Sequence, residues 1–332
     1  MTHPRSTDHP HACRAVVTDA PYALVKVSGA DRLTFLHNMT TAAVKGRSPG
    51  SRCEAAVVDH KGLLLAWVGL LVDRDWVWVT LEAGDQDALI AWFDRYIITE
   101  DVTVERVTAR HPVCLLLAPA AYRAPSEDGK KTPLSRIGQA FVVPGLMNEA
   151  ILMLPESDPT TWLEPLRQDG FEVWTHQEWE DWRIAWGLPA ARRDRDARTN
   201  PWEWGLTAAI SLDKGCYLGQ EVIARLNTYD KVQRCLMGLD FETDAVHLGA
   251  EIQILSDPAA PVAIGVITSL TPPVGPSPGR ALALIKRNQA EEGRPVAIVT
   301  PDGRTHLAHL RARWFQRGQA SLTLGTESPQ TQ

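Results

Sequence analysis

The residues best suited to chemistry gather in one stretch, Ser211–Glu221, which reads SLDKGCYLGQE. It places the thiol of Cys216 two residues after the amine of Lys214. A thiol near a lysine ammonium and near the positive end of a helix dipole favours the thiolate form, which is the reactive one. The alternative is a small apolar residue packed under a turn, as free cysteines often are. Both interpretations of Cys216 stay open at the level of sequence.

Three elements must position this stretch. The apolar segment Thr207–Leu212 predicts the end of a strand, and Asp213–Gly215 predicts a tight turn. From Gly219 onward a helix is predicted, because apolar residues recur at helical spacing: Leu218, Val222, Ile223 and Leu226. The thiol is therefore expected on a turn between a strand and a helix.

The length of 332 residues is too great for one ordinary core. Strands separated by hairpin turns and flanked by helices predict two antiparallel α+β domains, over residues 14–110 and 111–231. Short strands divided by Gly/Pro turns predict a small C-terminal β-barrel over 232–318. We expect disordered tails at 1–13 and 319–332. The sequence leaves open whether the chain crosses from one α+β domain to the other and back.

A helix start is visible at Thr175-His176-Gln177-Glu178, which has the pattern of a capping box. Thr175 is the expected N-cap and Glu178 the residue three positions later. Gly187 and Pro189 are expected to terminate this helix, which carries Arg183.

Composition excludes several classes of protein. The formal net charge of -6 argues against direct nucleic-acid binding, which needs a basic face. The arginine-rich segment 192–198 is interleaved with aspartates and predicts a solvated loop, with a phosphate or polyglutamate contact as the alternative. The five cysteines are widely spaced and indicate neither a disulfide framework nor a metal site. No apolar leader or membrane-length run occurs, so we expect a cytoplasmic protein without membrane contact.

Twelve tryptophans are an unusual number, and several lie at short spacing. Such groups favour either packing faces or the wall of a pocket for a planar ligand. The groups are Trp76/Trp78, Trp179/Trp182/Trp186 and Trp202/Trp204.

The segment Lys214–Glu221 resembles the K-G-C-Y-x-G-Q-E signature of the YgfZ-type folate-binding family. That family is related to the glycine-cleavage T-protein aminomethyltransferases and includes the mitochondrial factor for iron–sulfur cluster assembly. Other segments resemble it too: 24–31 with Phe35-Leu36, 201–206, 265–269 and 281–287. The resemblance implies three domains in a T-protein-like ring around a central folate-binding channel, two of them α+β and the third a barrel.

The resemblance also implies roles for individual residues. Cys216 would be the functional thiol that contacts a sulfur-, iron- or one-carbon-bearing partner, and Lys214 would hold it as thiolate or bind an anionic group. The implied cofactor is tetrahydrofolate or a one-carbon derivative, and no metal site is implied. The residues expected at the folate are Tyr217, Gly219, Gln220, Glu221, Arg225, Glu203, Trp202, Trp204 and Arg183. Glu203 has the alternative role of capping a helix or turn.

Two departures from the family pattern bear on the activity. Residues 37–43 read HNMTTAA where the family usually has Q-G-Q-x-T-N-D, and the predicted strand Leu63–Val68 lacks the catalytic aspartate of T-proteins. With these departures, the resemblance implies an accessory protein for iron–sulfur cluster assembly or repair, and through it for tRNA-modifying enzymes. Its partners would be folate and iron–sulfur assembly or client proteins. The alternatives are a folate-dependent aminomethyl transferase and a non-catalytic scaffold that has lost folate binding.

Overall fold

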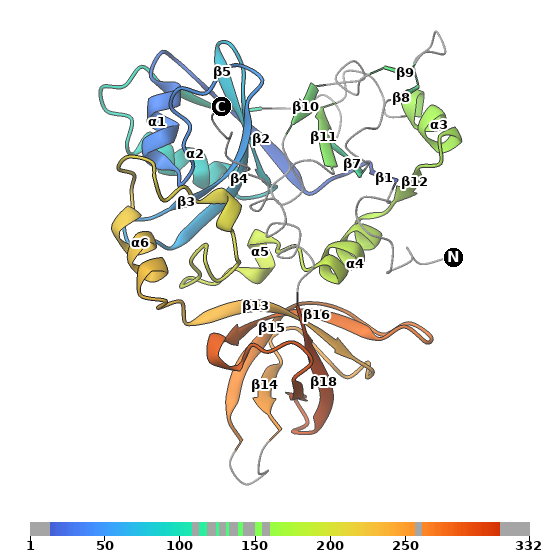
Figure 1. Cartoon of the computed structure of the whole chain (residues 1–332). Coiled ribbons are helices and arrows are strands. Elements are labelled where there is room, and N and C mark those ends of the chain that lie inside the picture. The colour runs from blue at the N-terminus through green and yellow to red at the C-terminus, as the bar shows by residue number, and fades with distance from the viewer. Residues whose placement is uncertain are drawn as a thin grey trace, which may run out of the picture. The chain divides into compact units, whose positions relative to one another are not determined.

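The computed structural model describes residues 14–107, 113–117, 124–125, 131–132, 139–141, 150–154, 160–255 and 261–312 (Figure 1). The expectation of disordered tails at 1–13 and 319–332 lies outside these residues. Contacts divide the chain into two compact units, Met1–Glu180 with Ala209–Ala224, and Asp181–Ala208 with Arg225–Gln332. The domain boundaries expected near residues 110 and 231 stay a prediction.

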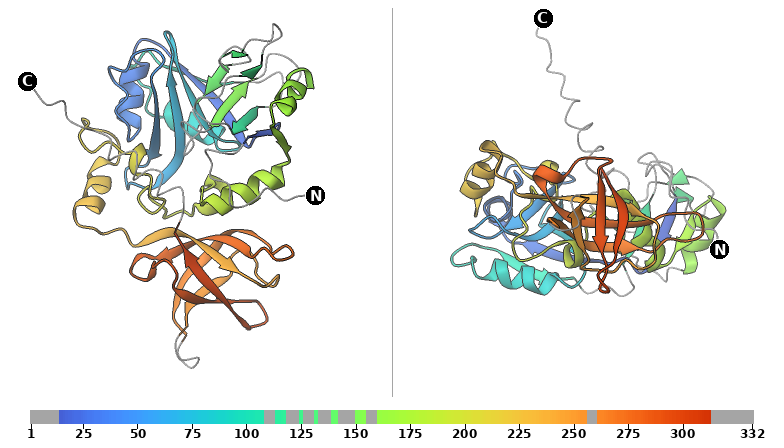
Figure 2. Two further views of the ribbon diagram at one scale, coloured as in Figure 1. Left: turned by 45° about the vertical axis from the view of Figure 1, so that its right-hand side comes forward. Right: turned by 90° about the horizontal axis from the view of Figure 1, so that it is seen from below.

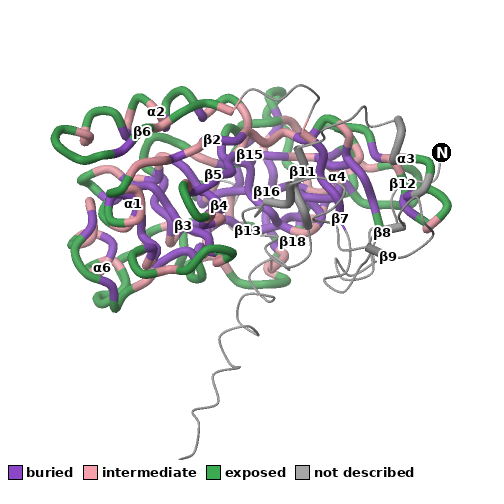
Figure 3. Tube along the Cα trace, turned by 90° about the horizontal axis from the view of Figure 1, so that it is seen from above, coloured by how far each residue is buried: buried purple, intermediate pink, exposed green. Residues whose placement is uncertain are grey.

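The first unit contains a five-stranded antiparallel sheet in the order β3-β4-β5-β2-β6. The strands β4 and β5 are apolar at most positions of both faces, so they are buried along most of their length (Figure 3). The strands are β2 (Tyr22–Ser28), β3 (Arg52–Val58), β4 (Leu64–Val72), β5 (Trp76–Glu82) and β6 (Thr103–Arg106).

Helices α1 (Arg32–Met39) and α2 (Gln86–Asp94) pack on one face of this sheet. Alternate residues of each strand point to this face, as the two-residue period of a strand requires. The core there contains, among others, Val25, Phe35, Leu36, Ala55, Val57, Ala66, Val68 and Phe93. The opposite face carries Glu54 and Trp67, which take no part in that core.

A second sheet in the first unit has the order β10-β11-β7-β1-β12, and all its pairs are antiparallel except β1 with β12. Its bounds are β1 (Ala15–Val17), β7 (Cys114–Leu117), β10 (Gln139–Phe141), β11 (Ala150–Leu154) and β12 (Glu172–Trp174). The chain begins its described part in this sheet and then enters the first one at β2. Two short strands, β8 (Ala124–Pro125) and β9 (Lys131–Thr132), pair with each other.

The two helices that follow are α3 (Thr160–Gln168) and α4 (His176–Trp186). The capping box predicted at α4 is confirmed. The Glu178 carboxylate accepts from the Thr175 backbone N–H at 2.7 Å, and the Thr175 hydroxyl accepts from the Glu178 N–H at 3.2 Å. Trp76 and Trp78 lie edge to face with ring centroids 5.8 Å apart, which makes this pair a packing face.

The second unit contains a closed barrel in the order β13-β16-β15-β14-β17-β18 (Figure 2). Short helical segments also belong to this region: α5 (Ala191–Asp194) and the 3-10 turn η4 (Arg287–Gln289). The barrel strands are β13 (Arg234–Phe241), β14 (Glu251–Ile254), β15 (Ala263–Thr271), β16 (Gly279–Lys286), β17 (Pro295–Val299) and β18 (Thr305–Arg311). The expected fold class, two α+β parts and a C-terminal barrel, is confirmed.

A buried ion pair within the α4–α5 segment is hydrogen-bonded to the barrel in the second unit. The Arg183 side chain is 2% exposed and the Asp194 side chain 0%, with Nη1 and Oδ2 3.2 Å apart. Asp194 also accepts from the Ala190 N–H at 2.8 Å and from the Ser269 hydroxyl at 2.8 Å. The Thr268 hydroxyl is a further donor to it. These donors stabilise a carboxylate that burial would otherwise penalise.

We expect Asp194→Asn to destabilise the protein by about 3–5 kcal/mol, because it removes the charge that balances a buried guanidinium. Urea unfolding followed by tryptophan fluorescence measures this loss. Asp244→Asn is the matched control, since Asp244 is exposed, and it should change the stability by less than about 0.5 kcal/mol. Equal stability of Asp194→Asn and the unmodified protein would contradict the role given to this pair.

Candidate functional site

The segment before the signature is not a strand end, contrary to the expectation for Thr207–Leu212. Residues Thr207–Ala209 form a 3-10 turn, η3. The backbone beyond it is tied to Thr41, whose carbonyl accepts from the Ser211 N–H at 2.9 Å and whose hydroxyl donates to the Ala209 carbonyl at 2.6 Å. These tertiary hydrogen bonds replace a strand ladder, and only Ala209 and Ile210 of the segment are buried.

The helix predicted after the signature is present as α6 (Gln220–Thr228). Ile223 is its buried residue and faces the turn between β3 and β4. A Cβ built on Gly62 of that turn would lie 3.1 Å from the Val222 side chain. The close approach explains why the turn carries glycine at this point, and it docks α6 on the first sheet.

Lys214 is buried and anchors the signature loop to the end of α1. Its ammonium donates to the carbonyl oxygens of Thr40 at 2.6 Å and Ala42 at 2.8 Å, and also to that of His37. The three acceptors match the three donors of an ammonium group. The carbonyls at a helix C-terminus are moreover a favourable place for a cation. Burial lowers the pKa of Lys214 to about 8, so the amine keeps its proton at neutral pH.

This position changes how the role of Lys214 is understood. Its donors are directed to backbone carbonyls of the first sheet's α1–β3 connection, and its Nζ lies 4.6 Å from the ring centroid of Tyr217. Lys214 therefore fixes the loop. The expected contact with the Cys216 thiolate or with an anionic group stays a prediction.

Cys216 lies at the exposed tip of the loop, directly after an exposed glycine. Among the other cysteines in the described ranges, Cys53 and Cys114 are buried and Cys235 is partly exposed. Burial raises the pKa of Cys114 to about 12 and also raises that of Cys53. These two thiols are thus held in their inert form, whereas the thiol at residue 216 is accessible to a partner.

The remaining signature residues shape the loop around that thiol. Tyr217 is buried, and burial raises its pKa to about 12. The Gln220 amide donates to the Lys214 carbonyl at 3.4 Å, and the Leu218 N–H donates to the Asn38 carbonyl at 3.0 Å. Glu221 and Arg225 are exposed on α6. The loop is consequently held from both ends while its middle faces outward.

Gly219 is required by two independent features. Its φ of 81° lies in the left-handed region, and a Cβ at this position would collide with the Asp59 carbonyl oxygen on the β3–β4 turn. Any other residue would shift the start of α6 relative to that turn.

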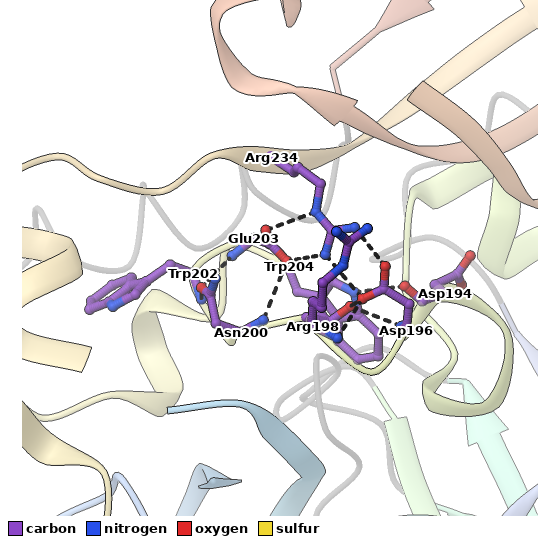
Figure 4. Close-up of polar contacts among 9 residues, drawn as sticks. Asp194, Asp196, Arg198, Asn200, Trp202, Glu203, Trp204 and Arg234 are labelled. Atoms are coloured by element: carbon purple, nitrogen blue, oxygen red, sulfur yellow. Dashed lines mark hydrogen bonds and ion pairs between the residues drawn. The ribbon is translucent and has the colours of Figure 1, made fainter. Parts of the chain in front are cut away.

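Five of the predicted folate residues belong to the second unit, where Glu203 lies in a charge cluster (Figure 4). Arg234 donates to both Glu203 oxygens, at 3.0 and 2.9 Å, and to Asp196 at 2.6 and 3.0 Å. The Asn200 N–H donates to Glu203 at 3.3 Å. Arg234 holds the pKa of Asp196 well below its usual range. Three of the roughly four acceptor positions of the Glu203 carboxylate are thereby used.

The two tryptophans beside Glu203 differ in exposure. Trp204 is 0% exposed, and its indole donates to the Asp194 carbonyl at 3.1 Å. Trp202 is partly exposed, and its ring points away from the charge cluster (Figure 4). Arg183 is enclosed by its pairing with Asp194. A direct folate contact of any of these residues stays a prediction.

Sequence reasoning missed several residues of this region. Arg234 opens a barrel strand and gave no local signal, because its acid partners lie about thirty to forty residues earlier. The aspartates of segment 192–198 were expected in a solvated loop, but Asp194 is fully buried and Asp196 pairs with Arg234. Glu54 is a buried carboxylate on β3 that accepts from Trp67 Nε1 at 3.1 Å. The neighbouring strand β4 is the one that lacks the catalytic aspartate of T-proteins.

Within the described ranges, no cluster of three or more histidine, cysteine or acidic side chains could hold a metal ion. No helix in the same ranges is long and apolar enough to cross a membrane.

We expect Gly219→Ala to destabilise the signature loop by about 1–3 kcal/mol, because it adds a steric clash to the cost of a left-handed backbone. Thermal unfolding measures the change. Gly46→Ala is the matched control, since Gly46 has φ 82° but nothing within 4 Å of its would-be Cβ. If both variants lose the same stability, the close approach to Asp59 contributes nothing.

The chain is similar in sequence and in structure to several known proteins. A search of protein-family models finds no match. A protein of Arabidopsis thaliana described as a putative chloroplastic transferase is 27% identical over 304 residues, which cover 85% of this chain and 68% of the relative. The tRNA-modifying protein YgfZ of Klebsiella pneumoniae is 25% identical over 237 residues, covering 66% and 69%.

Among solved structures, the aminomethyltransferase T of the glycine cleavage system from Bartonella henselae superposes with a TM-score of 0.73. It is 19% identical, and the match covers 92% of this chain and 87% of that one. The expected T-protein-like fold is confirmed by this similarity.

Proposed function

We propose, from the premise that this chain is of the YgfZ type, that it is a folate-binding accessory protein linked to tRNA modification. Its finer role would be to support the assembly or repair of iron–sulfur clusters in tRNA-modifying and other enzymes. The observation that carries the proposal is the signature loop, in which an exposed Cys216 is presented by a buried Lys214 anchor. Two independent restraints, Lys214 and Gly219, hold that loop in one position.

The chemistry of the loop suits a partner that carries iron, sulfur or a one-carbon group. A thiolate is both a nucleophile and a soft ligand for iron. Cys216 is free and exposed, so a client protein can approach it. With a single cysteine on the loop, contact with a cluster would be transient and would need further ligands from the client.

The cofactor in this proposal is tetrahydrofolate or a one-carbon derivative, which would supply or accept the one-carbon group. The exposed or partly exposed candidates for contact with it are Trp202, Gln220, Glu221 and Arg225. Glu203 keeps about one acceptor position for a donor on the pterin edge. Trp204 and Arg183 would act by supporting these residues, while Tyr217 and Gly219 would shape the loop.

The proposal includes a cytoplasmic location, and its macromolecular partners are iron–sulfur assembly or client proteins. Direct contact with nucleic acid is not part of it, since the net charge is -6.

A second candidate function is aminomethyl or one-carbon transfer of the T-protein type, and Glu54 is the observation that favours it. This buried carboxylate pairs with Trp67, the residue next to Ala66 on the strand that lacks the aspartate. Turnover of methylenetetrahydrofolate with a purified amine donor, abolished by Glu54→Gln, would favour the transferase. Tetrahydrofolate binding without turnover would favour the accessory role.

We expect Cys216→Ser to bind tetrahydrofolate normally but to lose at least about tenfold in the rescue of an iron–sulfur tRNA-modifying enzyme, in cells that lack their own YgfZ. The change removes a soft, ionisable sulfur while it preserves the size of the side chain. Quenching of tryptophan fluorescence measures folate binding, and the level of modified tRNA measures rescue.

Cys235→Ser is the matched control, because this cysteine also forms no disulfide and is partly exposed but lies on the barrel strand β13. It should rescue as well as the unmodified chain. Full rescue by Cys216→Ser would remove the thiol from the function. A fluorescence titration without quenching at tetrahydrofolate concentrations far above micromolar would leave the non-catalytic scaffold as the remaining interpretation.

A further inference from the structure

The arginine-rich segment 192–198 carries more positive charge at its surface than its sequence indicates. It contains four arginines interleaved with two aspartates. Interleaved charges of this kind usually neutralise one another on a solvated loop. The fold separates them instead, because both aspartates bind arginines that lie outside the segment.

Asp194 is turned inward, where it is 0% exposed. Its carboxylate accepts hydrogen bonds from Arg183, from the Ala190 N–H and from the hydroxyls of Thr268 and Ser269. The charge of Asp194 is therefore balanced in the interior by Arg183. It does not neutralise an arginine at the surface of the segment.

Asp196 is balanced by a second arginine from outside the segment. Arg234 donates to its two oxygens at 2.6 and 3.0 Å, and this contact holds the pKa of Asp196 well below its usual range (Figure 4). Arg234 is shared with Glu203. These three side chains together leave one negative charge, against the four arginine cations of the segment. An excess of positive charge consequently remains there.

The arginines of the segment are accessible to a ligand. Arg192, Arg193 and Arg198 are exposed, and Arg195 is partly exposed. Among the described residues, no acidic side chain pairs with the guanidinium group of Arg192 or Arg198. These two groups can therefore bind an anion without first breaking an ion pair within the protein. A guanidinium group matches a carboxylate through two parallel hydrogen bonds.

The kind of anion follows from the charge of the whole chain. With a net charge of -6, the protein repels a long polyanion such as a nucleic acid wherever it extends beyond the segment. The segment also contains no aromatic residue on which a base could stack. It is seven residues long, and it therefore suits a ligand that carries a few anionic groups on a short chain.

We propose that the segment 192–198 binds a short chain of carboxylates, namely the γ-linked glutamyl chain of a folate. The proposal rests on the folate binding proposed above, and it names the form of the folate that the protein prefers. The segment adjoins the residue assigned to the pterin edge, because Asp196 and Glu203 share Arg234 within the second unit. The Arg198 backbone N–H also donates to Asp196, at 2.9 Å.

The test compares tetrahydrofolate that carries one glutamate with tetrahydrofolate that carries five, by quenching of tryptophan fluorescence. Exposed ion pairs are individually weak, so we expect the longer form to bind about three- to tenfold more tightly. This advantage should disappear at about 1 M salt, where charges are screened within roughly 3 Å. Equal affinities of the two forms at low salt would overturn the proposal.

Two double variants separate the segment from the charge of the rest of the chain. Arg192→Gln with Arg198→Gln should abolish the preference for the longer form, while the affinity for the one-glutamate form stays within about twofold. The matched control is Arg52→Gln with Arg106→Gln, at two exposed arginines of the first unit, and it should keep the preference. A preference that persists in the first variant, or that is lost in the second, would contradict the assignment.

A measurement without the pteroyl group distinguishes this proposal from the proposed function. Penta-γ-glutamate alone, at millimolar concentration, should move the Nε–Hε NMR resonances of Arg192 and Arg198 in the unmodified chain, and the single variants assign these resonances. Unmoved resonances would overturn the proposal even if tetrahydrofolate binds. Movement in a protein that does not bind tetrahydrofolate would support the carboxylate site and contradict the folate function.

Competition identifies the source of the anionic groups. Inorganic tripolyphosphate and a single-stranded oligouridylate of matched charge are titrated against the complex with penta-γ-glutamate. Each should be needed at a concentration at least as high as that of the glutamyl chain. Displacement at a lower concentration would assign the segment to phosphate groups and overturn the proposal.

Discussion

The buried ammonium of Lys214 is the interaction on which the signature loop depends. It satisfies three carbonyl oxygens where α1 ends and thereby joins the loop to a helix more than 170 residues earlier in the chain. A buried charge without hydrogen-bond acceptors is costly. The Lys214 ammonium therefore stabilises the observed loop conformation and disfavours conformations in which it would lose its three carbonyl acceptors. The left-handed backbone at Gly219 and its close approach to the β3–β4 turn are a second, separate restraint on the same loop.

Buried polar contacts have different roles in the signature loop and in the second unit. Around the loop, charge and hydrogen bonds fix a position and leave one thiol exposed. In the second unit, the pairs Arg183–Asp194 and Arg234–Glu203 join the segment around α5 to the barrel. Breaking a buried ion pair by removing one partner costs several kcal/mol of stability. Arg183 and Glu203, which the family resemblance assigns to folate binding, therefore also stabilise the fold.

Much of this was readable from the sequence. Local patterns predict the meander of the first sheet, the capping box at Thr175 and the barrel. The T-protein-like fold was implied by the resemblance to the YgfZ type, which agrees with the relatives found. The strand expected at 207–212 and the solvated loop at 192–198 failed because tertiary contacts decide both. No local pattern shows that Lys214 reaches the end of α1, or that Asp194 lies inside the second unit.

The place of β1 in the second sheet has a consequence for the order in which the protein can form. Ala15 pairs with Leu117 on one side and with Glu172 on the other, so β1 must wait for partners that are made about a hundred residues or more after it. Such long sequence separation slows folding, because loop closure must precede the contacts that reward it. During translation, the sheet of β2 to β6 can form from consecutive residues. The β1 strand finds its first partner only when β7 has left the ribosome, and its second only when Trp174 has followed.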